Sequence, residues 1–422
     1  MKTLFALIVS ATTLAAAQTG APTAPNAKST PAQLSMTQAR EAIQEKPEQY
    51  LGYNLLAAAL VRRARETSDP SFYAEAATAV QKSMQLTPKN FETEKIRVSI
   101  LLGEHDFPAA LGAANALNKQ VPDDVTVYSF QAEANAELGN YQEAETAAQW
   151  MLNLRPGNVP ALIQAAQLRR TFGDLDGSYE LFQLAYESTL QAENTDRAWL
   201  LTQMGDLRLN SGKTDDAEKL LQQALDAFPK YPLALKSMAE VRTVQTRSDD
   251  ALGLLRQCYQ FAPRAENLYA LAKGLHLAKH EAEANQAFAA FEAKSLEESD
   301  KKDNSNRDLV FYYTDQAKQP AKALRVAELE YAWRKDVYTL DAYAWALHTA
   351  GQNAEALRQI KAALSVGIRD ARFFGHAGEI SFKSGDARAA ELYLKQAVEL
   401  NPFDSGLARV MLATLAKSGR SD

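Results

Sequence analysis

The segment Asp341–Pro402 contains the same pattern twice, and this repetition constrains the fold more than any other feature of the chain. When the second copy is shifted by 34 residues, Gly351 aligns with Gly385 and Ala356 aligns with Ala390. Each copy has two apolar stretches of helical periodicity, separated by a turn that contains glycine. A fixed period of this length is typical of architectures in which similar helix pairs stack in a row.

The small residue of this pattern can be followed back through most of the chain. It forms a column of ten positions in steps of 33, 34 or 39 residues, namely Ala76, Ala110, Ala144, Ser178, Ala217, Ala251, Ala284, Ala323, Ala356 and Ala390. Five residues earlier, glycine permits the positive φ of a tight turn at Gly139, Gly173, Gly212, Gly351 and Gly385. Twelve residues later, proline ends the second helix at Pro88, Pro122, Pro156, Pro229, Pro263 and Pro402.

In these features the chain resembles the tetratricopeptide repeat family, over about residues 36–418. Two segments show the resemblance best, MGDLRLNSGKTDDAEKLLQQALDAFP (204–229) and AELGNYQEAETAAQWMLNLRP (136–156). The resemblance implies an all-α fold, a right-handed α-solenoid of about ten helix pairs with a capping helix at each end. In that family the first helix of each pair lines the inner wall of the superhelix, and the repeats usually bind rather than catalyse.

The N-terminal residues have a different character from the repeats. Residues 1–17 have a charged start, an apolar run and three alanines, a pattern that predicts a secretory signal peptide and export to the periplasm or outside. Residues 18–33 are rich in Pro, Thr and Ala, so we expect a flexible tether. No other stretch suggests a membrane span, so the mature chain is expected to have no transmembrane segment.

Two solenoid parts are expected, covering residues 34–294 and 307–419, the second ending in a capping helix. The polar segment SLEESDKKDNSN (295–306) separates them. It is either a hinge between two halves or a surface loop within one continuous solenoid. Beyond it, Phe311 and Glu330 stand where the repeat normally has small residues.

The sequence contains no recognisable catalytic signature. It lacks a nucleophile elbow, a zinc-binding histidine pair on one helix and a phosphate-binding glycine loop. Its 5 histidines fall in separate repeats or on different helix faces, and its single cysteine cannot form an internal disulfide. We therefore predict that the protein is not an enzyme and has no cofactor or metal. The net charge of −6, without a basic stripe, argues against nucleic acid.

Function is then expected on the concave groove formed by the first helices. Helical spacing selects as partner-binding candidates Asn54, Arg62, Lys95, Arg170, Trp199, Tyr269, Asp308, Tyr312, Asp315, Asp341, Trp345, His348 and Arg372. The same spacing also places on this face Glu133, Gln167, Asp206, Lys236, Glu240 and Lys273.

Two clusters among these candidates suggest specific chemistry. Asn54 and Lys95, with Arg62 nearby, occupy positions that resemble a clamp for a peptide carboxylate in some family members. The acidic and aromatic residues between Asp308 and His348 suit a basic or extended peptide, unless the aromatics pack between repeats. We predict a non-enzymatic scaffold of the bacterial envelope that binds a protein or peptide. The alternative is a glycan-binding or polysaccharide-export accessory protein that uses aromatics of the groove.

Overall fold

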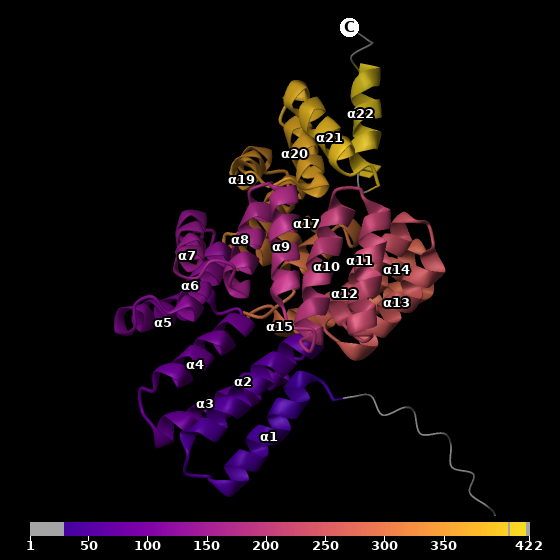
Figure 1. The fold of residues 1–422 in the computed structure, drawn as a ribbon. Helices are drawn as coiled ribbons and strands as arrows, with labels where there is room; N and C mark the ends of the chain where they lie inside the picture. Colours follow the sequence, from indigo (N-terminus) through magenta and orange to yellow (C-terminus); the bar gives the residue numbers. More distant parts are fainter. Residues whose placement is uncertain (1–28, 404–405, 419–422) are drawn as a thin grey trace, which may run out of the picture.

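The computed structural model describes residues 29–403 and 406–418, and the described residues confirm the predicted all-α solenoid. They form 22 α-helices and one short π-helical segment, with each helix packed antiparallel beside the next. Figure 1 shows the helices following one another from α1 at one end to α22 at the other. Within the described residues, no helix combines the length and apolar character that crossing a membrane requires.

Ten helix pairs make up the body of the solenoid, as the alanine column predicts. The first helices of the pairs are α2 (Tyr50–Thr67), α4 (Phe91–Gly103), α6 (Val125–Leu138), α8 (Val159–Thr171), α10 (Asn194–Asn210), α12 (Pro232–Val244), α14 (Ala265–Leu277), α16 (Asn306–Phe311), α18 (Val337–Thr349) and α20 (Ala371–Lys383). The second helices are α3 (Ser71–Leu86), α5 (Phe107–Gln120), α7 (Tyr141–Leu154), α9 (Leu175–Ser188), α11 (Thr214–Ala227), α13 (Ser248–Phe261), α15 (Glu281–Glu298), α17 (Pro320–Trp333), α19 (Asn353–Ser365) and α21 (Ala387–Leu400).

A further helix covers each end of this array. At one end α1 (Pro31–Glu45) packs beside α2 and places Met36 in the first core. Because Thr30 forms a capping box with Gln33, the helix starts at Pro31, and the predicted tether to residue 33 was too long by three residues. Residues 1–28, with the predicted signal peptide, lie outside the described residues. At the other end, α22 (Gly406–Ser418) packs on the apolar face of α21.

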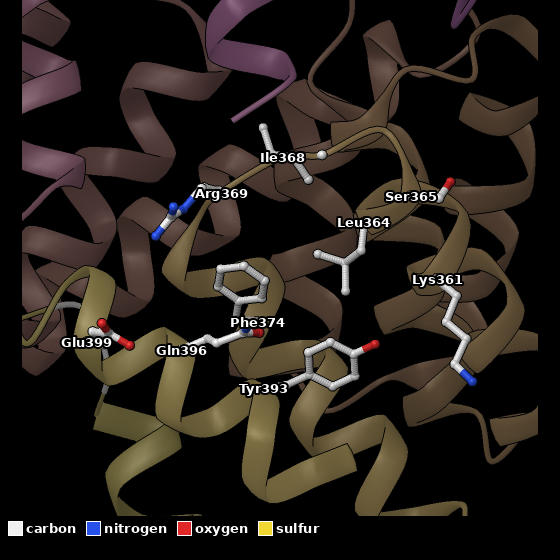
Figure 2. A pocket seen from close by; sticks show the side chains of 10 residues that line it. Lys361, Leu364, Ser365, Ile368, Arg369, Phe374, Tyr393, Gln396 and Glu399 are labelled. Carbon is white, nitrogen blue, oxygen red and sulfur yellow. The ribbon is translucent and has the colours of Figure 1, made fainter. Parts of the chain in front are cut away.

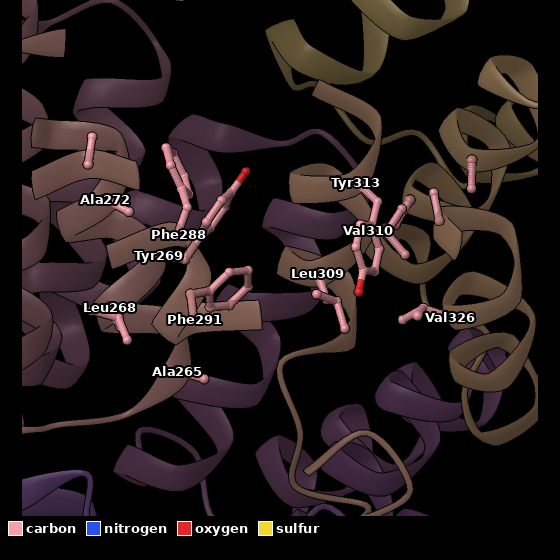
Figure 3. Packing of buried hydrophobic residues seen from close by; sticks show 14 of the residues in the cluster. Ala265, Leu268, Tyr269, Ala272, Phe288, Phe291, Leu309, Val310, Tyr313 and Val326 are labelled. Carbon is pink, nitrogen blue, oxygen red and sulfur yellow. The ribbon is translucent and has the colours of Figure 1, made fainter. Parts of the chain in front are cut away.

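Small residues let the two helices of a pair approach closely. All ten members of the alanine column are at most 3% exposed. At Gly205, an added Cβ would lie 2.8 Å from Leu221, and at Gly378 it would lie 2.5 Å from Leu394. Larger side chains from neighbouring helices fill the remaining space. Figure 3 shows this for Tyr269, Phe288 and Phe291, which group beside the next pair.

The eighth pair departs from the pattern, as its sequence suggested. After Phe311 its first helix continues as the π-helical segment η1 (Tyr312–Gln316). Glu330, which replaces a small residue, is 1% exposed. Its carboxylate accepts hydrogen bonds from the guanidinium of Arg334 and, at 3.2 Å, from the amide of Asn306. The buried charge is therefore neutralised locally rather than exposed to water.

The solenoid closes on itself, so that turns of the early pairs contact connections of the late pairs. The hydroxyl of Tyr141 accepts a hydrogen bond of 2.8 Å from the amide of Val337, and the side-chain amide of Asn401 donates one of 3.2 Å to the carbonyl of Leu209. These partners are 196 and 192 residues apart in the sequence. We call this line of contacts the inter-turn seam.

Glycine allows the closest approaches along the inter-turn seam. A Cβ on Gly173 would lie 2.2 Å from the carbonyl oxygen of Gly367, and a Cβ on Gly139 would lie 2.6 Å from that of Lys335. The other two turn glycines near the C-terminus, Gly351 and Gly385, have no such neighbour within 4 Å.

The polar segment 295–306 is fixed at several points. Its first residues continue α15, and both carboxylate oxygens of Asp303 accept hydrogen bonds from Arg264, at 2.8 and 3.1 Å. Asp303 also lies 3.4 Å from Nδ1 of His105, in the turn of the second pair. Buried Ser305 donates to Ser295 at 2.8 Å. These contacts favour a continuous solenoid over a hinge at this segment.

Candidate functional site: the inner face of the solenoid

The first helices present charged side chains to an enclosed interior. Consecutive first helices from α8 to α16 contribute both signs, as Arg170, Asp206, Lys236, Glu240, Lys273 and Asp308. Burial raises the pKa of all three carboxyls in this set, those of Asp206, Glu240 and Asp308. Each carboxyl therefore lies in an environment with less water than an open surface, although it keeps solvent access.

Groups from distant repeats act on one another across this interior. Tyr338, on α18, is the main cause that raises the pKa of Arg170 on α8. Burial is the main cause that raises the pKa of Glu240 on α12, and the charge of Arg372 on α20 partly opposes it. These groups therefore share one interior and are not isolated on separate repeats. The interior carries charges of both signs, contributed by several repeats.

A pocket of about 280 Å³ opens from the wall of this interior at the eighth pair. It is lined by Asn304, Ser305, Arg307, Asp308, Phe311, Tyr338 and Arg372. The guanidinium of Arg307 lies 3.2 Å from Asp336, and that of Arg372 is stacked 5.0 Å from the Phe311 ring centroid. Both cations are thus held in place by neighbouring side chains. Sequence reasoning selected Asp308 and Arg372 but missed Arg307, Phe311 and Tyr338, whose positions depend on the irregular eighth pair.

The predicted carboxylate clamp near the N-terminus is not formed. Asn54 is 5% exposed, and its side-chain oxygen accepts a hydrogen bond from Thr93. The ammonium group of Lys95 lies 3.0 Å from carboxylates of both Glu92 and Asp124. Arg62 is paired with Glu193, in the connection between α9 and α10, and with Asp196, in the first turn of α10. Two acidic partners neutralise Lys95, so its charge is already used within the fold.

The predicted acidic and aromatic cluster is largely a contact between repeats. Asp341 is fully buried and accepts a hydrogen bond of 2.7 Å from Nδ1 of His376. Trp345 is 8% exposed, its indole stacks on His376 with centroids 4.1 Å apart, and its N–H donates to Asp315 at 2.9 Å. The prediction that Asp341 and Trp345 face the groove was wrong, because these side chains connect α18 to α20 and η1. Trp345 offers no free ring to a sugar.

The remaining predicted residues divide between core and inner face. Tyr269 is buried against Phe291, with centroids 4.7 Å apart, which corrects its assignment to the groove. Tyr312, Trp199 and His348 are half-buried. The rings of Tyr312 and Trp199 contact neighbouring helices, whereas His348 stacks on Trp345 of its own helix and its Nε2 lies 3.4 Å from Glu379 on α20. The predicted residues whose charged ends keep access to the interior are Arg170, Asp308, Asp315 and Arg372.

These observations define an all-α solenoid whose enclosed inner wall presents charges of both signs. The tetratricopeptide repeat model matches residues 97–159, 202–266 and 343–405, so the chain contains tetratricopeptide repeats in these three segments. No curated protein has a sequence that matches this chain.

Solved structures with a similar course of the chain have little sequence in common with it. Human IFIT1, in a monomeric mutant form with Gppp-AAAA, is 14% identical with a TM-score of 0.50, and the alignment covers 87% of this chain and 95% of that one. Yeast Tom70 is 12% identical with a TM-score of 0.38, covering 91% and 92%. A tetratricopeptide repeat protein from Parabacteroides merdae is 20% identical with a TM-score of 0.37, covering 61% and 98%. At these identities the likeness concerns the fold alone.

Proposed function

We propose that the protein is a non-enzymatic scaffold of the bacterial envelope, and that it holds an extended segment of a partner protein against its inner face. The family supports a binding role, since its repeats present surfaces rather than reactive groups. The envelope location rests on the signal-like residues 1–17 of the sequence.

The observation that carries this proposal is the mixed charge of the enclosed wall. Lys236, Glu240 and Lys273 lie on two consecutive first helices, so a bound chain meets alternating signs as it passes. An extended peptide can match such a wall with its own charged side chains, whereas a polyanion would meet repulsion from the carboxylates. Partial dehydration of these groups makes each matched pair stronger than on an open surface.

Site-specific photo-crosslinking in the native organism tests both parts of the proposal. A benzophenone amino acid is placed at Lys273 on the inner face or, as a matched control, at Lys219, which is 73% exposed on the second helix α11. We expect one discrete adduct from position 273 in the envelope fraction and none from position 219. Equal adducts from both positions, or recovery of the protein only in the cytoplasm, would contradict the proposal.

A further inference from the structure

A second pocket lies away from the inner face, on the side of the second helices. It has a volume of about 540 Å³ and is bounded by α19, α20, α21 and the connection between α19 and α20. This volume falls within the range of about 300–1,000 Å³ that is usual for sites that bind small ligands or anchoring side chains. The pocket is therefore large enough to hold a bulky side chain of a partner.

The middle of this pocket is apolar, and its two ends are charged. Leu364, Phe374 and Tyr393 lie at the centre, and the two rings are roughly parallel with centroids 6.5 Å apart. Figure 2 shows Arg369 near one end and Lys361 near the other, with the rings between them. The layout suits a ligand that is apolar in its middle and charged on both sides.

The inter-turn seam explains why the pocket is present at this connection. Ile368 stands where most of the other connections have proline, and Gly367 beside it has a φ of +108°. An added Cβ on Gly367 would lie 2.8 Å from the carbonyl oxygen of Phe172, so the connection is docked against the turn after α8. This contact holds one wall of the pocket in position before any ligand arrives, which lowers the entropy cost of binding.

The charge of the pocket selects the chemistry of its ligand. Lys361 and Arg369 are both exposed, and within the described residues neither lies in an ion pair. One carboxylate, that of Glu399, also lines the pocket, so its local charge is positive while the chain as a whole carries −6. Negative groups are therefore attracted to this place on an otherwise acidic protein.

We propose that this pocket binds a short acidic segment of a protein partner, in which a bulky apolar or aromatic side chain is flanked by Asp or Glu. The apolar side chain enters between Leu364, Phe374 and Tyr393, and the flanking carboxylates reach Lys361 and Arg369. This second site uses the second helices, so a partner held here leaves the inner face accessible.

The test uses displayed random octapeptides selected on the full chain, followed by fluorescence anisotropy with the most enriched fluorescein-labelled peptide. We expect the enriched sequences to have an aromatic or large aliphatic residue with acidic residues on both sides. Lys361→Glu should raise the Kd about tenfold by replacing attraction with repulsion. Tyr393→Ala should raise it by a similar or larger factor by removing an aromatic contact. Lys395→Glu, on α21 but outside the pocket lining, should leave the Kd within about twofold.

Several results would overturn the proposal. These are enrichment of peptides without acidic residues, no enrichment at all, an unchanged Kd in Lys361→Glu, or loss of binding in the inner-face variant Lys273→Glu instead. Lys361 is an exposed side chain, so its variant keeps the fold and the test does not depend on Tyr393→Ala being stable. Circular dichroism of each variant checks that its helical fold is retained.

Discussion

The inter-turn seam makes a sharp prediction about two glycines at equivalent positions of the repeat. Gly173 and Gly351 both lie five residues before the alanine column, and both have a φ of +81°. An alanine at either position is strained by the left-handed backbone, at about 1–2 kcal/mol. Of these two glycines, only Gly173 touches another superhelical turn. Any loss of stability in Gly173→Ala beyond that in Gly351→Ala therefore measures the contribution of the inter-turn seam.

The size of this further loss follows from the geometry. The Cβ of Gly173→Ala would lie 2.2 Å from the carbonyl oxygen of Gly367, whereas ordinary contacts begin near 3.4 Å. The two turns must separate by about 1.2 Å at this point, and overpacking of this kind costs about 1–3 kcal/mol. We expect Gly173→Ala to lower the free energy of unfolding by about 2–5 kcal/mol in total and Gly351→Ala to lower it by about 1–2 kcal/mol.

Urea unfolding followed by circular dichroism compares the two variants, and small-angle X-ray scattering reports whether the superhelix opens. Because repeat arrays can unfold in steps, the midpoints of the transitions are compared rather than extrapolated free energies. The radius of gyration should increase in Gly173→Ala and stay constant in Gly351→Ala. If the two variants have the same midpoint and the same radius, the seam does not hold the superhelix closed in solution, and the reasoning is refuted.

Four further predictions concern single side chains. Tyr141→Phe removes the hydroxyl that accepts the 2.8 Å hydrogen bond from the amide of Val337, so it should lower the free energy of unfolding by about 1–3 kcal/mol and speed hydrogen exchange at that amide. Unchanged exchange at Val337 would contradict this hydrogen bond. Burial raises the pKa of Glu137 to about 7 from 4.5, so the stability that its protonated carboxyl contributes is complete below pH 4.5 and is lost as the pH rises to 7. Glu137→Gln should flatten the stability profile between these two pH values, as measured by urea unfolding at pH 4.5 and at pH 7. Burial also raises the pKa of the Cys258 thiol to about 11, so native protein should resist alkylation at pH 8 while denatured protein reacts fully; fast native labelling would exclude a core thiol. Trp345→Ala should lower the free energy of unfolding by about 3–5 kcal/mol, because the indole is packed between repeats, and a loss of partner binding at unchanged stability would instead support the groove position.

The sequence by itself determined the repeat and its register. The alanine column, the turn glycines and the terminal prolines respond to local needs, which are close helix contact, a positive φ and an end to a helix. All five turn glycines that the spacing selected have positive φ, and the ten predicted pairs are all present. These requirements recur at each repeat, so they leave a periodic signal that one sequence is enough to show.

The tertiary structure decided which residues face the interior and which turns meet. Gly173 and Gly351 are equivalent in sequence, yet only Gly173 lies at the seam, because that depends on the accumulated rotation of many helix pairs. In the same way, the spacing placed Asp341 and Trp345 on the groove, but bonds to His376 and Asp315 hold them between helices. Contacts between residues nearly 200 positions apart leave no periodic trace, so the seam and the enclosed interior emerge only when all the pairs are assembled.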